Sequence, residues 1–421
     1  MGFTMMTDNQ FLLYLVGAIS ITLGYCARRV TTNYFALRSL KVPGPLIAKL
    51  TSKWFFVHDT AGNNANCVHE LHKKYGGNIV QVAPRELSFS STAAIRDIYG
   101  LSAGCLKPKI YSAVGREAMF QMVDPEKHRE RQRRMIHIFG FNVLLQLEPM
   151  IQEQISRMID LVERSVRVVD NTIADIEEYG EARMKESIEK FGRHAQRPNL
   201  MTKMLAGDPE KGTEPLSDED ISSEVSNLIF AATDTTALEM ACVVRTRPPP
   251  GVARSTRREI QAFGVKEAKF PYLKLQNLPI LNAITKETLR VHLGVPPGLS
   301  RTTPKQGHMI DGIFVPGGTT VHVQPLTIHR NPKVFPDPEA LKPQRWIETN
   351  GGTPEMREHM FVWGFGNRVC RGQNMAMMEI KTMAARIVGR YTLRLTSEKT
   401  RDDMVLDYFI GFAKGHSCPD I

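Results

Sequence analysis

The sequence has little cysteine, and none of it is spaced for zinc or dithiol chemistry. Six cysteines are scattered over 421 residues at irregular intervals, and no C-x-x-C pair occurs. Zinc ribbons and redox dithiols need closely spaced pairs, and small disulfide scaffolds need many more cysteines. The sequence therefore argues against these classes, and the pattern indicates a reducing compartment.

Internal repeats, low-complexity tracts and basic clusters interleaved with aromatics are also missing. The net charge is +10, but lysine and arginine are spread along the whole chain. A nucleic-acid-binding surface needs concentrated basic residues, so no nucleic-acid partner is predicted. The excess positive charge favours an anionic membrane surface or an acidic protein partner. A hydrophobic content of 42% is enough for a large buried core, which excludes overall disorder.

One hydrophobic stretch lies near the N-terminus. Residues 11–27 carry no charge, and 17 residues lie at the lower end of the roughly 17–25 that cross a bilayer as a helix. Arg28 and Arg29 follow at once, whereas a cleaved signal peptide would have basic residues ahead of the stretch. The positive-inside rule therefore predicts a transmembrane anchor at 11–27, a luminal tail at 1–10 and a cytosolic remainder. A hydrophobic helix docked on the protein itself is the alternative.

Beyond the anchor, residues 28–45 form a basic segment that ends in Pro-Gly-Pro and predicts a stiff hinge. Residues 46–421 are predicted to form one large domain, mainly α with a minor β-sheet. A hairpin is expected at 78–91 with its turn at 83–85, and helices dominate 124–286. A tight turn at 315–319 separates two β-rich runs, and the last helix is expected from about Asn374.

Cys370 lies in the stretch WGFGNRVCRG, between Gly366 and Gly372 and two places after Arg368. A thiolate is a strong metal ligand and is stabilised by positive charge, backbone N–H groups and a helix N-terminus. Glycine permits conformations and close approaches that a Cβ would block. The stretch therefore indicates a metal-ligating thiolate, with an inert cysteine in a glycine-rich loop as the alternative.

Two other patterns carry charged or hydroxyl groups at informative positions. Glu287 and Arg290 lie one helical turn apart, and Arg345 lies in a proline-rich segment from which a guanidinium can bridge a carboxylate. Asp234 and Thr235 lie inside an apolar helical stretch, where they cost stability unless they are partnered or functional. A solvated ion pair and a helix-bending role are the respective alternatives.

In this order the residues resemble the cytochrome P450 superfamily of haem-thiolate monooxygenases. The ligand loop of that family is matched by Trp363, Gly366, Arg368, Cys370 and Gly372. Its E-x-x-R helix and the arginine that completes a structural triad are matched by Glu287, Arg290 and Arg345, and its oxygen-activating groove by the stretch AATDTT. The anchor and hinge are similar to those of a microsomal member of fungal type.

The resemblance implies a P450 fold with haem b, whose iron is held by the Cys370 thiolate. It implies that Trp363 packs beside the sulfur and that Gly366 and Gly372 let backbone amides hydrogen-bond the sulfur. It also implies that the haem propionates pair with Arg368, His128 and Arg301. Asp234 and Thr235 would relay protons to dioxygen.

The same resemblance implies partners and a location. NADPH-cytochrome P450 reductase would supply electrons, and one oxygen atom would enter an apolar small molecule, in fungal secondary metabolism. The protein would be a single-pass protein of the endoplasmic reticulum membrane with its catalytic domain facing the cytosol.

The sequence departs from the family pattern at several places. Trp363 replaces the usual phenylalanine, Ala232 a glycine, and Gln132 an arginine on the propionate-binding helix. The interval from His128 to Asp234 is short, which predicts a domain shortened between about 165 and 200. Three prolines at 248–250 interrupt a helix of the family, and a compensated reading-frame error or unspliced boundary is our hypothesis for that segment. A haem-thiolate isomerase or dehydratase, or a non-catalytic remnant that binds haem or nothing, are the alternative functions.

Overall fold

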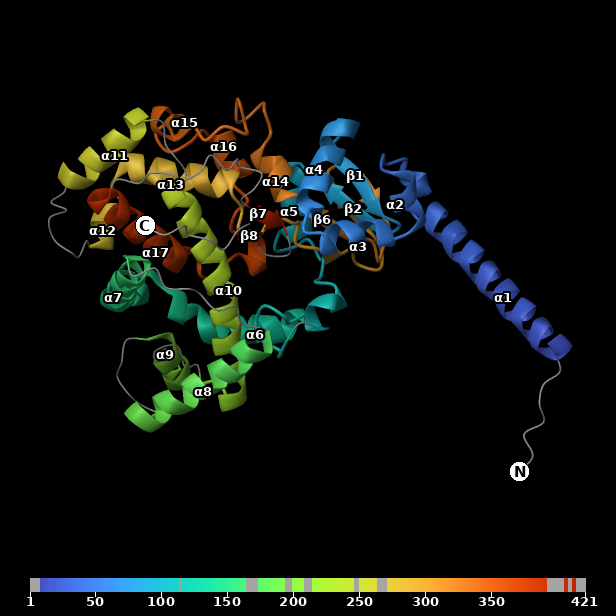
Figure 1. Cartoon of the computed structure of the whole chain (residues 1–421), viewed down its shortest axis with the longest axis horizontal. Coiled ribbons are helices and arrows are strands. Elements are labelled where there is room, and N and C mark those ends of the chain that lie inside the picture. Colours follow the sequence, from blue (N-terminus) through green and yellow to red (C-terminus); the bar gives the residue numbers. More distant parts are fainter. Residues whose placement is uncertain are drawn as a thin grey trace.

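The computed structural model describes residues 8–113, 115–163, 173–193, 199–207, 214–245, 250–262, 271–391, 405–407 and 411–413. These residues form a mainly helical domain with small sheets, as the sequence predicts. A single helix, α1 (Asp8–Phe35), projects away from the domain (Figure 1). Residues 1–7 of the predicted luminal tail lie outside the described residues.

The helix α1 is longer than the predicted anchor. It continues through Arg28 and Arg29 to Phe35, because no proline or glycine follows Gly24 until Pro43, so the first part of the predicted hinge is helical. A short turn, η1 (Arg38–Leu40), leads to the extended segment around Pro43, whose carbonyl accepts from the Gln81 N–H at 2.8 Å. Within the described residues, none of the helices combines the length and the apolar content that crossing a bilayer needs.

The predicted hairpin is confirmed and forms the centre of the N-terminal half. Strands β1 (Ile79–Ala83) and β2 (Glu86–Phe89) pair antiparallel around Pro84 and Arg85. Four helices surround them: α2 (Leu46–Leu50), α3 (Lys53–Thr60), α4 (Asn64–Tyr75) and α5 (Thr92–Tyr99).

Strands from the C-terminal half complete this sheet. β6 (Thr320–Val323) pairs parallel to β2, and β3 (Arg301–Thr302) pairs antiparallel to β6, giving the order β1-β2-β6-β3. A separate hairpin joins β4 (His308–Ile310) and β5 (Ile313–Val315). The two β-rich runs around the predicted turn at 315–319 therefore belong to different sheets and do not pair with each other.

Helices occupy the chain between Asp124 and Lys286, as predicted. They are α6 (Pro125–Met135), η3 (Ile136–Phe139), α7 (Phe141–Glu163), α8 (Ile173–Phe191), α9 (Leu200–Ala206), α10 (Asp218–Arg245), α11 (Pro250–Ala262), α12 (Tyr272–Leu275) and α13 (Pro279–Val291). The long helix α10 runs through the middle of this half (Figure 1). It ends at Arg245 and α11 begins at Pro250, while residues 246–249, which include Pro248 and Pro249, lie outside the described residues.

The C-terminal part returns to both halves. It contains α14 (Pro325–His329), α15 (Gln344–Glu348), α16 (Pro354–His359), η5 (Gly366–Arg368), α17 (Gln373–Arg390), β7 (Val405–Asp407) and β8 (Gly411–Ala413). The last predicted helix is thus confirmed and starts one residue earlier than expected.

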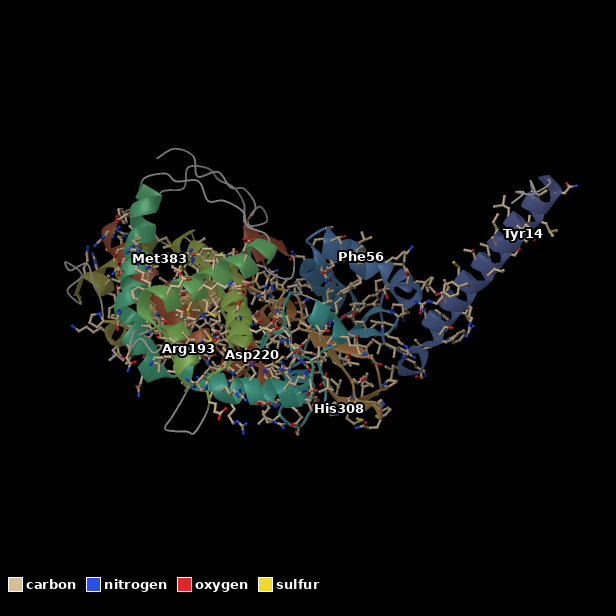
Figure 2. All side chains as sticks on the ribbon, turned by 90° about the horizontal axis from the view of Figure 1, so that it is seen from below. Tyr14, Phe56, Arg193, Asp220, His308 and Met383 are labelled. Carbon is tan, nitrogen blue, oxygen red and sulfur yellow. The ribbon has the colours of Figure 1, made fainter. Side chains whose placement is uncertain are left out.

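Two apolar clusters hold the domain together. One joins α7, α13 and α17 and includes Leu147, Leu281 and Met383, and Figure 2 shows the side chains around Met383. The other packs the four-stranded sheet against α5 and includes Leu87 and Phe89. Each fully buried side chain of this size contributes about 1.5–3 kcal/mol. The loop of Cys370 lies between elements of these two clusters, since α17 belongs to the first and α5, which packs on η5, to the second.

Candidate functional site

The Cys370 loop is held by close backbone contacts. The Cys370 N–H donates to the Trp363 carbonyl at 2.8 Å. Gly366 has a φ of 70°, and a Cβ there would lie 1.9 Å from the Tyr99 carbonyl oxygen, so only glycine fits. Gly372 has an ordinary φ of −79°, and its Cβ would only touch the sulfur at 4.0 Å. Gly366 therefore has a conformation and a close approach that require glycine, whereas the backbone of Gly372 has an ordinary conformation and its amide bonds the sulfur.

The surroundings of the sulfur favour a bound thiolate. Burial raises the pKa of the Cys370 thiol, and the N–H groups of Gly372 and Gln373 and the charge of Arg371 lower it in part. These two amides open α17, so the positive end of that helix faces the sulfur. Although protein atoms crowd the thiol, Cys370 keeps accessible surface and can meet a ligand.

Four basic side chains gather near this loop from separate parts of the chain. Arg301, His128 and Lys107 are buried at 4%, 6% and 7% exposure, and Arg368 is half-buried. Burial and then the charges of Arg301 and Arg368 lower the pKa of Lys107 to about 6. Burial and then Arg368 and Lys107 lower the pKa of His128 to about 3.

No carboxylate is among the groups that shift the pKa of Lys107, His128 or Arg368. Burial and then Arg301 also lower the pKa of Arg368, to about 10. Buried cations are costly unless an anion pairs with them, so the cluster fits an anionic ligand. The structure thus brings together the three predicted propionate-binding residues. Lys107 was missed, because a lysine in a polar loop carries no signal in the sequence.

The neighbours of the predicted propionate helix are placed differently. Arg131 forms ion pairs with Asp220 and with Glu224, at 2.9 Å to Glu224, on α10. It therefore ties α6 to α10 and does not substitute for the arginine that Gln132 replaces.

The predicted structural triad is assembled around one buried carboxylate. Arg290 Nε and Nη2 donate to Glu287 at 2.9 and 2.8 Å, and Arg345 Nε donates at 3.1 Å. Trp346 Nε1 and the Lys342 N–H add bonds at 2.8 and 2.9 Å. Although burial opposes it, these donors, Arg290 foremost, hold the pKa of Glu287 below its usual value.

Thr235 and Asp234 lie on the middle of α10. The Thr235 hydroxyl donates to the Ala231 carbonyl at 2.7 Å, and Thr233 bonds Ile229 in the same way. Ala231, Ala232 and Thr233 are exposed, whereas Asp234 and Thr235 are half-buried. Since α10 packs against α17, this stretch belongs to the same part of the molecule as Cys370.

A buried acid one turn further along was not predicted. Glu239 is 5% exposed, and neither carboxylate oxygen has a hydrogen-bond partner of good geometry. Burial raises the pKa of Glu239 well above its usual value, and the Gly294 amide, too loosely placed for a good bond, offsets this only in part. A Cβ at Gly294 would lie 3.5 Å from Thr235 Cβ and 3.7 Å from Glu239 Oε1, so both side chains border this glycine.

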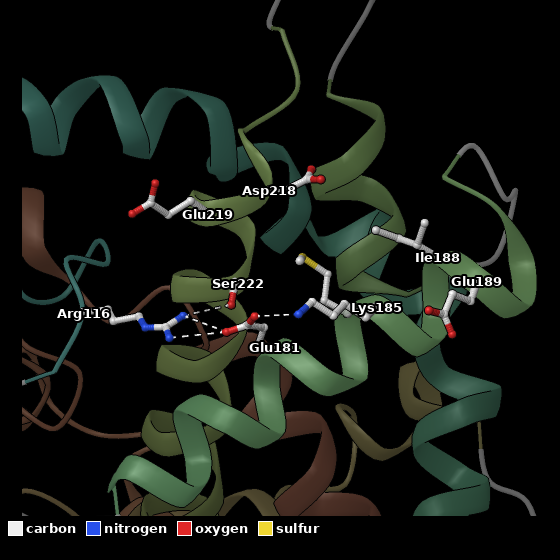
Figure 3. A pocket seen from close by; sticks show the side chains of 9 residues that line it. Arg116, Glu181, Lys185, Ile188, Glu189, Asp218, Glu219 and Ser222 are labelled. Carbon is white, nitrogen blue, oxygen red and sulfur yellow. Dashed lines mark hydrogen bonds and ion pairs between the residues drawn. The ribbon is translucent and has the colours of Figure 1, made fainter.

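A surface groove of about 450 Å³ lies elsewhere, between α8 and α10 (Figure 3). Arg116 donates to Glu181 at 3.4 Å and Lys185 pairs with it at 2.8 Å. None of the predicted site residues lines this groove, and three of its charged residues, Arg116, Glu181 and Lys185, pair with one another.

Residues 161–414, more than half of the chain, match the family model that is described as "Cytochrome P450". The chain belongs to the cytochrome P450 family. It is therefore a haem-thiolate monooxygenase, an oxidoreductase that carries haem b on a cysteine thiolate. Membership implies a reductase as redox partner and an apolar substrate.

Similar proteins come from fungi, and several of them carry the same description. Cytochrome P450 monooxygenase tazI of Aspergillus terreus is 26% identical, over 99% of both chains. Cytochrome P450 monooxygenase ORF11 of Penicillium roqueforti is 24% identical over 91% of this chain and 94% of its own. Pisatin demethylase of Fusarium vanettenii is 24% identical over 84% of each. The first alignment spans 501 positions, more than this chain has residues, so the relative has stretches that this P450 lacks.

The residues fit the haem of this family. A haem needs a thiolate on one face and basic groups for its propionates, and both are present: an accessible cysteine at a helix N-terminus and a cluster of basic side chains near it.

Proposed function

We propose that Cys370 is the haem ligand and that this P450 oxidises an apolar small molecule of fungal secondary metabolism. The observation that carries the proposal is the accessible Cys370 near the buried basic side chains of Arg301, His128 and Lys107. Bound haem supplies the iron that activates dioxygen.

The ligand loop prepares the sulfur and the propionate site. The amides of Gly372 and Gln373 bond the thiolate and limit its basicity, and Trp363 packs beside it. Arg368, Arg301 and His128 hold the propionates. The buried triad of Glu287, Arg290 and Arg345 keeps the segment before the loop in place.

The hydroxyl of Thr235 and the carboxylate of Asp234 move protons. Thr235 now donates to the Ala231 carbonyl, and rotation about its χ1 turns the hydroxyl toward the exposed side of α10. Asp234 connects it with solvent. An isomerase or dehydratase needs no such relay, so the presence of both residues favours the monooxygenase.

Electrons come from NADPH-cytochrome P450 reductase. The net charge of +10 supports an acidic partner, because opposite charges steer association.

We assign α1 as a single-pass anchor in the endoplasmic reticulum membrane, with the domain from 46 to 421 in the cytosol. The support is the exposure of its apolar side chains, among them Leu13 at 74% and Ile21 at 76%, on a helix that stands away from the domain. Arg28 and Arg29 sit at the cytosolic end.

The domain is shortened between about 165 and 200. The length of the tazI alignment supports this, and so does the short connection from α7 to α8, although 164–172 are outside the described residues.

Binding of carbon monoxide tests the proposal. The reduced, haem-loaded chain should show the strongly red-shifted Soret band of a thiolate ligand, and the Cys370→Ser variant should lose it, whereas Cys105→Ser should keep it. NADPH consumption with reductase, and loss of one product from a deletion strain, then identify oxygenation. A red-shifted band without NADPH consumption would leave a haem-binding remnant, and an unchanged band in Cys370→Ser would refute the assignment of the ligand.

A further inference from the structure

Glu239 is a buried acid on α10 that the rest of the chain leaves unsatisfied. It is 5% exposed, and neither carboxylate oxygen has a hydrogen-bond partner of good geometry among the described residues. Burial and the loosely placed Gly294 amide shift its pKa, and no basic side chain is among the groups that do so. A buried polar group without partners costs stability, which points to a ligand that supplies the missing hydrogen bonds.

The carboxyl lies close to the residue to which we assign the proton relay. Glu239 follows Thr235 by four residues on α10, so the two side chains share one face of the helix. Gly294, which follows α13, borders both: a Cβ there would lie 3.5 Å from Thr235 Cβ and 3.7 Å from Glu239 Oε1. These are ordinary contact distances, so a group of the size of a methyl or a hydroxyl fits beside Gly294 and reaches the carboxyl.

The protonation of the carboxyl decides which group complements it. Burial raises the pKa of Glu239 well above its usual value, and a buried carboxyl without a cation keeps its proton. A neutral carboxyl has one O–H donor and a carbonyl acceptor, and both lack partners here. An alcohol complements both atoms, because its oxygen accepts from the carboxyl O–H while its own O–H donates to the carboxyl oxygen. An ammonium group offers donors alone.

We propose that Glu239 binds a hydroxyl group of the substrate and so selects alcohols among otherwise apolar molecules. The inference rests on the proposed function, because the role of Thr235 places the reacting carbon near this face of α10. The hydroxyl lies beside Gly294, between Thr235 and Glu239. Glu239 is therefore a specificity-determining residue, and its contact with the substrate transfers no proton or electron.

The Soret band of the ferric, haem-loaded, full-length chain reports binding, because molecules that enter the site next to the haem shift it. The probes are three pairs of an alcohol and its hydrocarbon: borneol with bornane, menthol with menthane, and cyclododecanol with cyclododecane. At least one alcohol should bind wild type with a Kd roughly tenfold or more below that of its hydrocarbon, since it gains two buried hydrogen bonds.

Four variants separate the hydroxyl contact from other effects. Glu239→Gln keeps a donor and an acceptor at the same place and should keep the preference for the alcohol, whereas Glu239→Leu should lose it. Gly294→Ala should also lose it, because the added methyl fills the place of the hydroxyl. The backbone accepts this alanine, since φ of Gly294 is not positive. Glu219→Leu, at an exposed acid of the same helix, should behave as wild type.

The inference is overturned if no alcohol binds wild type more tightly than its hydrocarbon, or if Glu239→Leu and Gly294→Ala keep the preference. Loss of the preference in Glu239→Gln would overturn it as well, because a charged carboxylate would then be the binding group. Gly294→Ala decides if Glu239→Leu does not fold. Absence of the red-shifted carbon monoxide band in wild type would instead overturn the proposed function, so the two failures are distinguishable.

Discussion

The carboxylate of Glu287 connects three parts of this P450. It accepts bonds from α13 through Arg290, from α15 through Arg345 and Trp346, and from the backbone before α15. Arg290 is itself completely buried and donates to the carbonyls of His329 and Pro338 at 2.9 and 2.7 Å. Charges buried this deeply are stable only when each charged group keeps its ion-pair and hydrogen-bond partners.

Replacing Glu287 by glutamine should destabilise the haem-loaded chain by about 3–5 kcal/mol, because the buried Arg290 charge loses its counter-ion. Urea unfolding followed by circular dichroism measures this loss. Glu339→Gln removes a carboxylate that is 55% exposed and pairs with Arg330 at 3.4 Å, so it should cost less than about 1 kcal/mol. Similar losses for the two variants would contradict the central role of Glu287.

Glu239 should make the stability fall as pH rises. Its pKa is raised in the folded chain, so the folded chain holds a proton that the unfolded chain releases above the usual glutamate pKa. Stability is therefore lost from about pH 4.5 upward, with a slope that approaches about 1.4 kcal/mol per pH unit. Glu239→Gln removes this slope, so its gain in stability over wild type should grow as the pH rises above the usual pKa of glutamate.

Urea unfolding of both chains at several pH values measures this gain, with the exposed Glu214→Gln as control. A constant difference between Glu239→Gln and wild type across the range would show that Glu239 titrates normally.

At the scale of elements, α10 combines two uses of threonine. Thr233 and Thr235 both donate to the carbonyl four residues back, a bond that bends helices. Because the two hydrogen bonds are alike, replacing either threonine should have the same effect if both serve only to bend the helix. Of these two threonines, only Thr235 takes part in the proposed proton relay.

Thr235→Ala should lower product formation by about 10²-fold while NADPH consumption continues, because protons reach oxygen without control and the electrons leave as hydrogen peroxide. The ratio of product to NADPH and the peroxide released are the measurements. Thr233→Ala removes the matching helix bond and should keep the wild-type ratio. Equal uncoupling in both variants would assign Thr235 to helix bending.

At the scale of the whole molecule, α1 and the domain are joined at a well-defined place. Asn33 Nδ2 donates to the Leu50 carbonyl at 2.8 Å and Leu37 is buried against the sheet, so the domain begins near residue 33. The rest of α1 contributes little to the core.

Deleting residues 1–31 should release the protein from membranes and leave the carbon monoxide spectrum unchanged. Sedimentation of microsomes after a carbonate wash measures this. As a matched control, the double variant Leu13→Lys and Leu23→Lys keeps the length of the chain. Each added charge should oppose insertion of α1 into the membrane by about 2.5–3.5 kcal/mol. Release of the intact chain by carbonate would argue against a single-pass anchor.

The sequence predicted features that depend on near neighbours. The hairpin around Pro84, the start of α17 near Cys370 and the shared helical face of Glu287 and Arg290 follow from turn residues, helix periodicity and spacing. It also located the loop in which Gly366 is required, because the residues that define that loop are consecutive. The extension of α1 past Arg29 was missed, since a charged residue ends an apolar run without ending a helix.

Only the tertiary structure decided which distant groups meet. It joined β6 to the N-terminal hairpin, turned Arg131 toward α10, brought Lys107 beside Arg301 and Arg368, and buried Glu239 next to Gly294. Local conformation is set by interactions along a few residues of chain, whereas the burial and charge of a side chain depend on elements that packing brings from far away. For this reason the sequence alone determined the family, the cysteine loop and most of the helices, and the folded chain determined the cluster of basic side chains that we assign to the haem propionates.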